Sequence, residues 1–303
     1  MSLLTRQIFL TIFTYVTVHA YAQSAILFGA SGTVGSEVLR TLVQDEFWKE
    51  VVLIGRKVSP KVEEILSEAG DNDDNMHVTQ ISLPDLTNVD QNKSLLESEA
   101  IRKADACFIA VGAGYPHELS LFTWHKVDVE MICSMARLCN KVQVKHIALL
   151  SASEVENEPT PFSQDELNES ETNPIGWLKM VKFYARMKGL GENAVIEASG
   201  HIPFIRLFQP STIVTEDIRY GWVDWTLFHL HKFLDPIMPY HYHSVPAKLL
   251  GMAIANDAGE ILRDEGVSVK RVMDLHYLDY IRVAGTEYNQ QKEKENMKEN
   301  KEL

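Results

Sequence analysis

Tyr184 and Lys188 are the residues of this chain whose spacing most directly suggests proton chemistry. They are four positions apart, so a helix would place both side chains on one face, about one turn apart. A phenol with a pKa of about 10 is a poor acid or base at neutral pH, but a neighbouring ammonium stabilises the phenolate and lowers that pKa. The pair therefore predicts proton exchange with a substrate oxygen. Tyr288 and Lys292 repeat the spacing, so only the surrounding fold can distinguish the two pairs.

A glycine-rich turn predicts a second kind of site, one that binds a dinucleotide. An apolar strand over 25–28 runs directly into Gly29, Gly32 and Gly35, and an amphipathic helix follows. In such a turn the first glycine permits the sharp bend, the second lets backbone N–H groups approach a pyrophosphate, and the third lets the helix pack closely on the strand. The alternative is a strand–turn–helix that binds nothing. The residues between the glycines that we also expect at the cofactor are Ser31, Thr33 and Val34.

The residues that follow the second strand select the cofactor. An acidic residue there would hydrogen-bond the ribose of NAD, whereas a basic residue accommodates the additional phosphate of NADP. Here Arg56 and Lys57 follow the strand and no carboxylate is present, so we expect NADP (NADPH), with Arg56 as the bidentate phosphate ligand and Lys57 in support. The alternative is a solvated pair of cations. Gly112 and Gly114, after the fourth strand, would let the backbone pass close to the cofactor.

Apolar runs and helical patterns alternate along the chain, which predicts an α/β fold with a doubly wound parallel sheet and right-handed crossovers. We expect strands at 25–29, 51–55, 76–82, 105–111, 145–150 and 202–208, and helices at 33–46, 60–69, 91–102, 117–140 and 175–198.

Two segments depart from this alternation of strands and helices, residues 154–174 and the residues after 208. Residues 154–174 carry seven acidic residues and no Lys or Arg, which predicts an exposed loop at the carboxyl edge of the sheet, either a lid over the substrate or an inert insertion. The loop is also a possible contact for a protein partner. The residues expected to form a nucleotide-binding domain are 23–208, with this insertion, and those expected to form a small substrate-side lobe are 209–285.

The two ends of the sequence carry features that predict where in the cell the protein resides. Residues 1–22 have a basic residue, an apolar stretch and an Ala-Tyr-Ala site, as in a secretory signal peptide, and a membrane contact is expected only if this segment is not cleaved. The charged residues 286–303 are expected to be disordered and end in Lys-Glu-Leu, which is similar to a retention signal of the endoplasmic reticulum. We therefore expect the lumen of the endoplasmic reticulum; the alternative is a cytoplasmic enzyme with a misassigned start.

Composition limits the possible partners and metals. The formal net charge of −13, from 29 basic and 42 acidic residues, argues against a nucleic-acid partner. The three cysteines do not form a disulfide framework, and we expect buried thiols. His241 and His243 could suggest a metal, but no third ligand has suitable spacing, so we expect no metal and interpret them, with Trp222 and Trp225, as packing or pocket lining.

Taken together, the motifs resemble the extended and atypical branches of the short-chain dehydrogenase/reductase superfamily, and most closely the Tat-interacting-protein-type oxidoreductases. The resemblance rests on the glycine turn, the Leu-Ile-Gly-Arg run that ends at Arg56, the Leu-Leu-Ser-Ala-Ser run that ends at Ser153, and the Tyr184–Lys188–Glu192 spacing. It covers about residues 24–255.

The resemblance implies an NADPH-binding Rossmann domain with a Ser/Tyr/Lys set. Tyr184 would exchange the proton, Lys188 would hold the nicotinamide ribose, and Ser153, or otherwise Ser151, would hydrogen-bond the substrate oxygen. The family commonly has Arg-Pro after strand six, where this chain has Gln209 and Pro210. The backbone at Pro210 would still pass the nicotinamide carboxamide, but the role of the arginine is in doubt.

The expected function is that of an NADP-dependent oxidoreductase acting on a small carbonyl or alcohol. The alternative from another class is a non-catalytic NADPH-binding regulatory or interaction protein, which the acidic loop and the departure at Gln209 leave open. A nucleotide-sugar epimerase or dehydratase is a weaker third hypothesis, because the short C-terminal lobe leaves little room for a second nucleotide.

Overall fold

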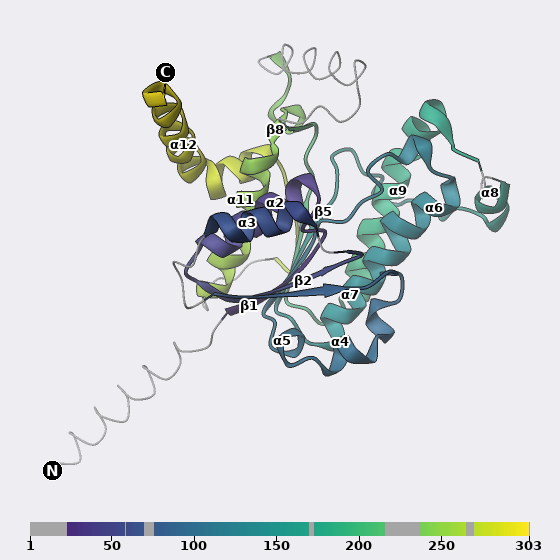
Figure 1. The fold of residues 1–303 in the computed structure, drawn as a ribbon. Helices are drawn as coiled ribbons and strands as arrows, with labels where there is room; N and C mark the ends of the chain where they lie inside the picture. The colour runs from purple at the N-terminus through teal and green to yellow at the C-terminus, as the bar shows by residue number, and fades with distance from the viewer. Residues whose placement is uncertain are drawn as a thin grey trace, which may run out of the picture.

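The computed structural model describes residues 23–57, 59–69, 76–169, 173–215, 237–264 and 270–302. Within these residues, seven parallel strands form one sheet in the order β3-β2-β1-β4-β5-β6-β9 (Figure 1). The strands are β1 (Gln23–Phe28), β2 (Trp48–Gly55), β3 (His77–Ser82), β4 (Ala106–Ile109), β5 (His146–Leu150), β6 (Phe204–Phe208) and β9 (Val272–Leu275).

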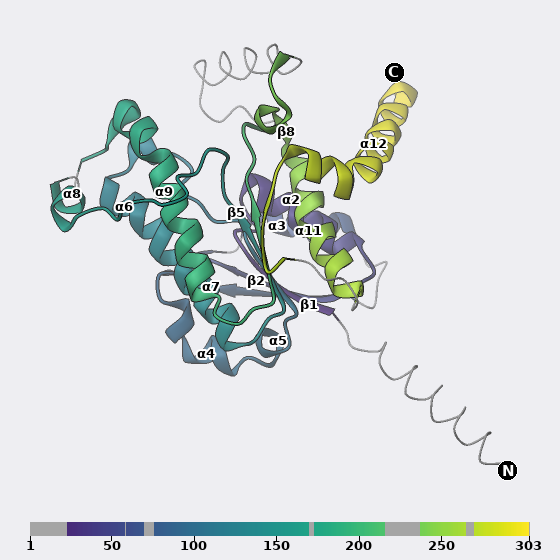
Figure 2. The same ribbon diagram turned by 180° about the vertical axis from the view of Figure 1, so that it is seen from behind.

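Helices cover both faces of the sheet, because the central strands are apolar on both sides. In β1, Ala25 and Leu27 pack into one core cluster, and Ile26 and Phe28 pack into the other. The first face is covered by α2 (Thr33–Gln44), α3 (Pro60–Ala69) and α11 (Ala247–Arg263), as Figure 2 shows from behind. The second face carries α4 (Lys93–Glu97), α5 (Glu99–Arg102), α7 (Ile132–Lys141) and α9 (Gly176–Ala198). This confirms the expected doubly wound α/β fold.

The segment after strand six does not form a separate lobe in the described residues, in contrast to what we expected of 209–285. Helix α11 packs against α2 in the main core, and β9 pairs with β6 as a further strand of the sheet. A small two-stranded sheet, β7 (Ile213–Val214) with β8 (Val245–Pro246), lies beside them. The expectation failed because the interrupted spacing of this region hides a buried helix followed by a short edge strand.

The C-terminal residues form a helix where we expected disorder. Helix α12 (Tyr277–Glu302) is anchored by the buried Tyr280 and Ala284 and then projects from the body (Figures 1 and 2). The anchored turns supply the costly nucleus, and the Glu-, Lys- and Gln-rich residues that follow are good helix formers.

The expected helix over 117–140 is interrupted. It consists of η2 (Pro116–Glu118), α6 (Leu121–His125), the π-helical segment η3 (Lys126–Met131), and α7. Hydrophobic periodicity does not reveal a π-helical turn, because one such turn changes the spacing by only a single residue.

The cysteines also differ from expectation. Cys107 on β4 and Cys139 on α7 form a disulfide, and Cys133 is the buried free thiol. Cys107 points to the face that α7 covers, and the 32-residue separation hides this pairing in the sequence.

Candidate functional site

The glycine turn has the geometry that a pyrophosphate cradle requires. Gly29 has φ of +87°, and a Cβ there or at Gly35 would collide with backbone, at Ala110 and at Gly29 respectively. The Gly32 N–H donates to the Gly29 carbonyl over 2.9 Å, and Gly32 begins α2 with no side-chain cap. The first N–H groups of α2 therefore have no capping side chain and face the turn, as an anion site at a helix N-terminus needs. These residues fit a dinucleotide.

A shallow cleft opens beside this turn. It lies between the turn, the carboxyl end of β2, the start of α3 and the end of β3, which is where the adenosine half of a dinucleotide binds in this fold. Ser31 and Lys57 line it.

The two cations after β2 take different positions. Both Arg56 and Lys57 are exposed, but of the two only Lys57 lines the cleft. The Arg56 carbonyl accepts a hydrogen bond from Ser82 Oγ over 3.1 Å. Their assignment to a phosphate stays a prediction.

Tyr184 and Lys188 lie on α9, and a third residue joins them. The Lys188 ammonium is 2.8 Å from Asp128 Oδ2 and 5.9 Å from the centre of the Tyr184 ring. A Cβ at Gly112 would lie 3.9 Å from Lys188 Nζ, so the backbone after β4 passes directly over the ammonium. The structure thus brings together two motifs of the sequence, the Tyr184–Lys188 pair and the glycine turn after β4 at Gly112, and adds Asp128.

Electrostatics keep Lys188 charged. Burial by itself would lower the pKa of Lys188, but the charge of Asp128, followed by interactions with Tyr184 and Glu192, outweighs it and raises the pKa above its ordinary value. A permanent cation therefore lies one turn from the phenol, as the sequence predicted.

The two candidate serines have different surroundings. The Ser151 hydroxyl is buried and donates to the Glu192 carboxylate. Ser153 is half-buried, and its N–H donates to the Pro210 carbonyl over 2.8 Å, which holds the loop after β5 against the loop after β6. The Ser151 hydroxyl is thus already engaged, and the preference for Ser153 at the substrate oxygen stays a prediction.

Gln209, at the position where the resemblance implied an arginine, has a defined partner. Its amide donates to both oxygens of Glu192, over 3.0 and 3.1 Å. Burial raises the pKa of Glu192, and the hydrogen bonds from Ser151 and Gln209 oppose that shift. Gln209 therefore holds Glu192 of α9 with a neutral amide, where an arginine would have placed a charged guanidinium.

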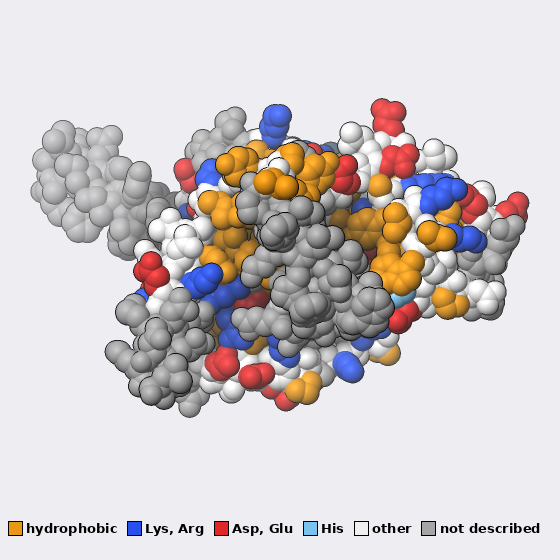
Figure 3. Space-filling view, turned by 90° about the horizontal axis from the view of Figure 1, so that it is seen from above, with side chains coloured by type: hydrophobic (Ala, Val, Ile, Leu, Met, Phe, Trp, Pro, Cys, Tyr) orange, Lys and Arg blue, Asp and Glu red, His pale blue; other side chains and the backbone are white. Residues whose placement is uncertain are grey.

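The face of α9 that carries Tyr184 and Lys188 continues as apolar surface toward the start of the helix. Trp177 and Val181 share that face at helical spacing and are 48% and 69% exposed, and Leu178 beside them is 91% exposed. Hydrophobic side chains gather on this upper side of the molecule (Figure 3).

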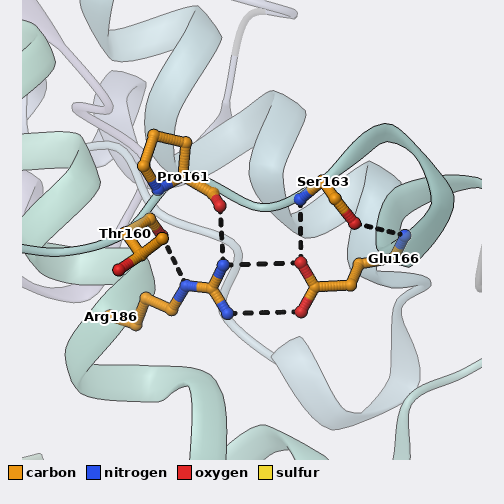
Figure 4. Close-up of polar contacts among 5 residues, drawn as sticks. All are labelled: Thr160, Pro161, Ser163, Glu166 and Arg186. Atoms are coloured by element: carbon orange, nitrogen blue, oxygen red, sulfur yellow. Dashed lines mark hydrogen bonds and ion pairs between the residues drawn. The ribbon is translucent and has the colours of Figure 1, made fainter.

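The acidic segment is fastened to α9 rather than free. The Arg186 guanidinium donates to the carbonyls of Thr160 and Pro161 over 2.6 and 2.7 Å and pairs with Glu166 at 3.3 Å (Figure 4). A short helix, α8 (Gln164–Glu169), forms within the segment, and Phe162 and Leu167 are buried. The segment therefore differs from the exposed loop that we expected, because it contains a short helix and two buried apolar side chains.

Some expected residues lie outside the described part of the chain. Residues 1–22, Trp222, Trp225 and the side chain of His241 belong there. Gly114, with φ of +69°, is described and forms the bend after Gly112. Among the described residues, no group of three or more His, Cys, Asp or Glu could hold a metal ion, and no helix is long and apolar enough to cross a membrane.

Asp128 and Trp124 are the site residues that the sequence analysis missed. The indole N–H of Trp124 donates to Asp128 Oδ2 over 3.0 Å. Their i,i+4 spacing is visible in the sequence, but nothing in it shows that Asp128 faces Lys188, 60 positions away.

A glycine cradle at the first βα turn of a seven-stranded parallel sheet, with a Tyr–Lys pair near the end of β4, defines an NAD(P)-binding enzyme fold of the extended short-chain dehydrogenase/reductase class. The sequence model of the 3-beta hydroxysteroid dehydrogenase/isomerase family matches residues 26–219, and the chain belongs to this family. No curated protein matches the chain significantly.

Solved structures share the fold at low identity. They include a short-chain dehydrogenase/reductase from Serratia marcescens (14% identity, 84% of this chain and 97% of that chain covered, TM-score 0.55). They also include UDP-glucuronic acid 4-epimerase from Bacillus cereus in complex with NAD (15%, 87% and 84%, TM-score 0.52) and MoeE5 in complex with UDP-glucose and NAD (14%, 87% and 81%, TM-score 0.51). At these identities the likeness concerns the fold alone.

Proposed function

We propose that the protein is an NADP-dependent oxidoreductase that interconverts a carbonyl and an alcohol. The observation that carries the proposal is the position of the Lys188 ammonium under the Gly112 backbone, with Tyr184 one turn along the same face. The finer likeness to the Tat-interacting-protein type rests on the sequence motifs alone, which are the glycine turn, the runs that end at Arg56 and Ser153, and the Tyr184–Lys188–Glu192 spacing.

The residues divide the work. NADPH would supply the hydride, and the protein supplies orientation and the proton. Tyr184 donates its phenolic proton to the carbonyl oxygen during reduction and recovers it during oxidation. Lys188 holds the nicotinamide ribose and stabilises the phenolate, and Ser153 donates a hydrogen bond to the substrate oxygen.

The surface beside Tyr184 favours an apolar substrate. Trp177 and Val181 continue the reactive face of α9, and their exposed side chains would lose contact with water if a hydrocarbon lay along them. We therefore expect apolar aldehydes and ketones to turn over better than polar ones of the same length.

The experiment is a screen of aldehydes, ketones and quinones with NADPH, followed by Y184F on the best substrate. This variant keeps the ring and removes only the hydroxyl, so turnover should fall by roughly 10²- to 10⁴-fold while NADPH affinity stays unchanged. Y288F is the matched control, because Tyr288 and Lys292 have the same spacing on the remote α12.

A second function remains as the alternative, that of an NADPH-binding regulatory protein. The neutral Gln209, at the position where the resemblance implied an arginine, favours it. If the protein binds NADPH but turns over no compound of the screen, with UDP-glucose included as the test of the epimerase hypothesis, the regulatory function replaces the enzymatic one.

We also propose that the protein enters the secretory pathway and stays in the lumen of the endoplasmic reticulum. The features of residues 1–22, the Lys-Glu-Leu ending and the Cys107–Cys139 disulfide support this location. A reporter fused to residues 1–30 should be secreted. A reporter that stays in the cytosol would contradict the proposal.

A further inference from the structure

Asn92 begins an Asn-Lys-Ser sequence, Asn92 to Ser94, that the proposed enzymatic function leaves unused. An asparagine with a serine or threonine two positions later is the acceptor for N-linked glycans in proteins of the secretory pathway. The chain contains one more such sequence, from Asn168 to Ser170. The structure describes all three residues of the first sequence, but not Ser170 of the second.

Asn92 caps helix α4, and the cap engages three of its four polar groups. Its side-chain Oδ1 accepts the N–H of Leu95 over 3.2 Å, and its carbonyl accepts the N–H of Leu96 over 3.1 Å. Its backbone N–H donates to the Val89 carbonyl over 3.1 Å. The cap therefore holds the side-chain amide in one orientation.

The fourth polar group of Asn92, the amide nitrogen Nδ2, is the atom to which a glycan would be attached. Among the described residues it has no hydrogen-bond partner, and it is not one of the buried polar atoms that lack one, so it reaches solvent. The side chains of Lys93 and Ser94 are exposed beside it. Because Oδ1 faces the helix, Nδ2 points away from it, and a sugar on Nδ2 would break no contact of the cap.

A glycan at this position would also leave the candidate site open. The segment η1 (Val89–Gln91), which precedes Asn92, contacts the end of α7, where the Lys141 ammonium donates to the Asp90 carbonyl over 2.6 Å. From there the chain enters the amino end of β5, whereas the glycine turn follows the carboxyl end of β1. Figures 1 and 2 show α4 at the lower end of the molecule, opposite α6 and α8.

We propose that Asn92 carries an N-linked glycan, with Ser94 completing the acceptor. The inference rests on the proposed entry into the secretory pathway and goes beyond the oxidoreductase function. The donor is an oligosaccharide joined to a lipid through a diphosphate. The bond from the first sugar carbon to the diphosphate breaks, a bond from that carbon to Asn92 Nδ2 forms, one amide proton leaves, and the lipid diphosphate is released. No oxidation or reduction takes place.

The experiment uses the full chain, produced in animal cells, with N168Q as the background. Asn168 is exposed on α8, and its removal leaves Asn92 as the single acceptor of this pattern in the sequence. Peptide N-glycosidase should increase the gel mobility of this protein by one discrete step. In heavy-oxygen water the same enzyme should convert the asparagine at position 92 to a labelled aspartate, which peptide mass spectrometry identifies.

Three variants at the acceptor test the assignment. S94A removes the hydroxyl and keeps the cap, so the mobility step should disappear. S94T is its matched control, because it keeps a hydroxyl and should keep the step. N92D should also lose the step, and its melting temperature should equal that of the deglycosylated parent, because aspartate and asparagine are equally good caps. A step that persists in S94A and N92D would overturn the proposal.

A leader exchange separates failure of the site from failure of the location. In a second version of the chain, the signal peptide of a known secreted protein replaces residues 1–22. If only this version shows the step, the proposed location has failed and the acceptor has not. If this version is protected from protease inside intact microsomes and still shows no step, the assignment of Asn92 is wrong.

Discussion

At the scale of single residues, Arg56 and Lys57 show how neighbours with the same charge can differ in what they reach. Both are exposed at the carboxyl end of β2, but Lys57 lines the cleft beside the glycine turn, and the carbonyl of Arg56 is held by Ser82. The sequence ranked Arg56 first because a guanidinium matches a phosphate better. The geometry gives Lys57 an equal claim.

Removing either cation should weaken NADPH and spare NADH. R56A and K57A each remove a charge-assisted contact to the phosphate that only NADPH carries, so the affinity for NADPH should fall by about 10-fold or more. Lys61, on the first turn of α3 but not among the cleft residues, supplies the control K61A. Calorimetric titration measures all three variants. Equal affinities of the parent for the two cofactors would refute the NADP assignment.

The site could be predicted from the sequence wherever one local run of residues carries it. The glycine turn and the Tyr184–Lys188 pair are local, and both have the expected backbone setting. Asp128 and the Glu192–Gln209 contact join residues that are distant in sequence, so no spacing rule reveals them.

At the scale of elements, the first βα unit depends on one close approach. Gly35 on α2 has no room for a Cβ because the Gly29 carbonyl is already there, whereas a Cβ at Gly55, the last residue of β2, would have its nearest neighbour at 3.7 Å. The same residue type is thus required at one position and replaceable at the other.

G35A and G55A should therefore differ strongly. The added methyl at Gly35 has to push α2 away from the turn, which should cost about 1–3 kcal/mol of unfolding free energy and weaken NADPH binding. G55A should change the unfolding free energy by less than about 0.5 kcal/mol. Urea denaturation gives both numbers, and similar losses in the two variants would contradict this account of the turn.

The Cys107–Cys139 disulfide joins β4 to α7, so it closes a loop of the second face of the sheet. Replacing both cysteines by alanine should lower the unfolding free energy by about 2–4 kcal/mol. C133A is the control, because Cys133 is free and burial raises the pKa of its thiol. Peptide mapping without reductant should find the 107–139 linkage, and free thiols at both positions would show that the pair is reduced.

At the scale of the whole molecule, the parallel sheet and six of its strands could be predicted from the sequence, but the seventh strand could not. The six expected strands are present, because alternating buried strands and amphipathic helices define the parallel sheet. The seventh, β9, has only four residues and depends on α11 and α12 to bring it beside β6, which is a property of the tertiary fold.

A buried cluster of three polar side chains, one each from β5, β6 and α11, lies away from the reactive pair and contributes to the stability of the fold. His146 Nε2 and Arg206 Nε each lie 3.4 Å from Asp257 Oδ2, and all three side chains are buried. Burial lowers the pKa of His146, although Asp257 opposes the shift. The folded protein therefore holds this imidazole in its neutral form.

Stability should consequently decrease in mild acid. The unfolded chain takes up a proton on His146 below about pH 6.5 and the folded chain does so only at lower pH, so this contribution is complete above pH 6.5 and is lost as the pH falls below it, by up to about 1.4 kcal/mol per pH unit. Urea melts between pH 5 and 8 should show this slope in the parent and in H77Q, whose histidine is exposed, but a smaller slope in H146Q. The same slope in all three would exclude His146 as its source.

The projecting helix α12 has a practical consequence for labelling and immobilisation. Its 26 residues correspond to about 39 Å of helix, and its buried residues among those described, Tyr280 and Ala284, lie in the first turns. A fluorophore or an affinity tag attached at its far end would be separated from the glycine turn and from Tyr184 by a built-in spacer. The protein can therefore be tethered to a sensor surface through this end, with the cofactor cleft and the reactive face of α9 left open to solution.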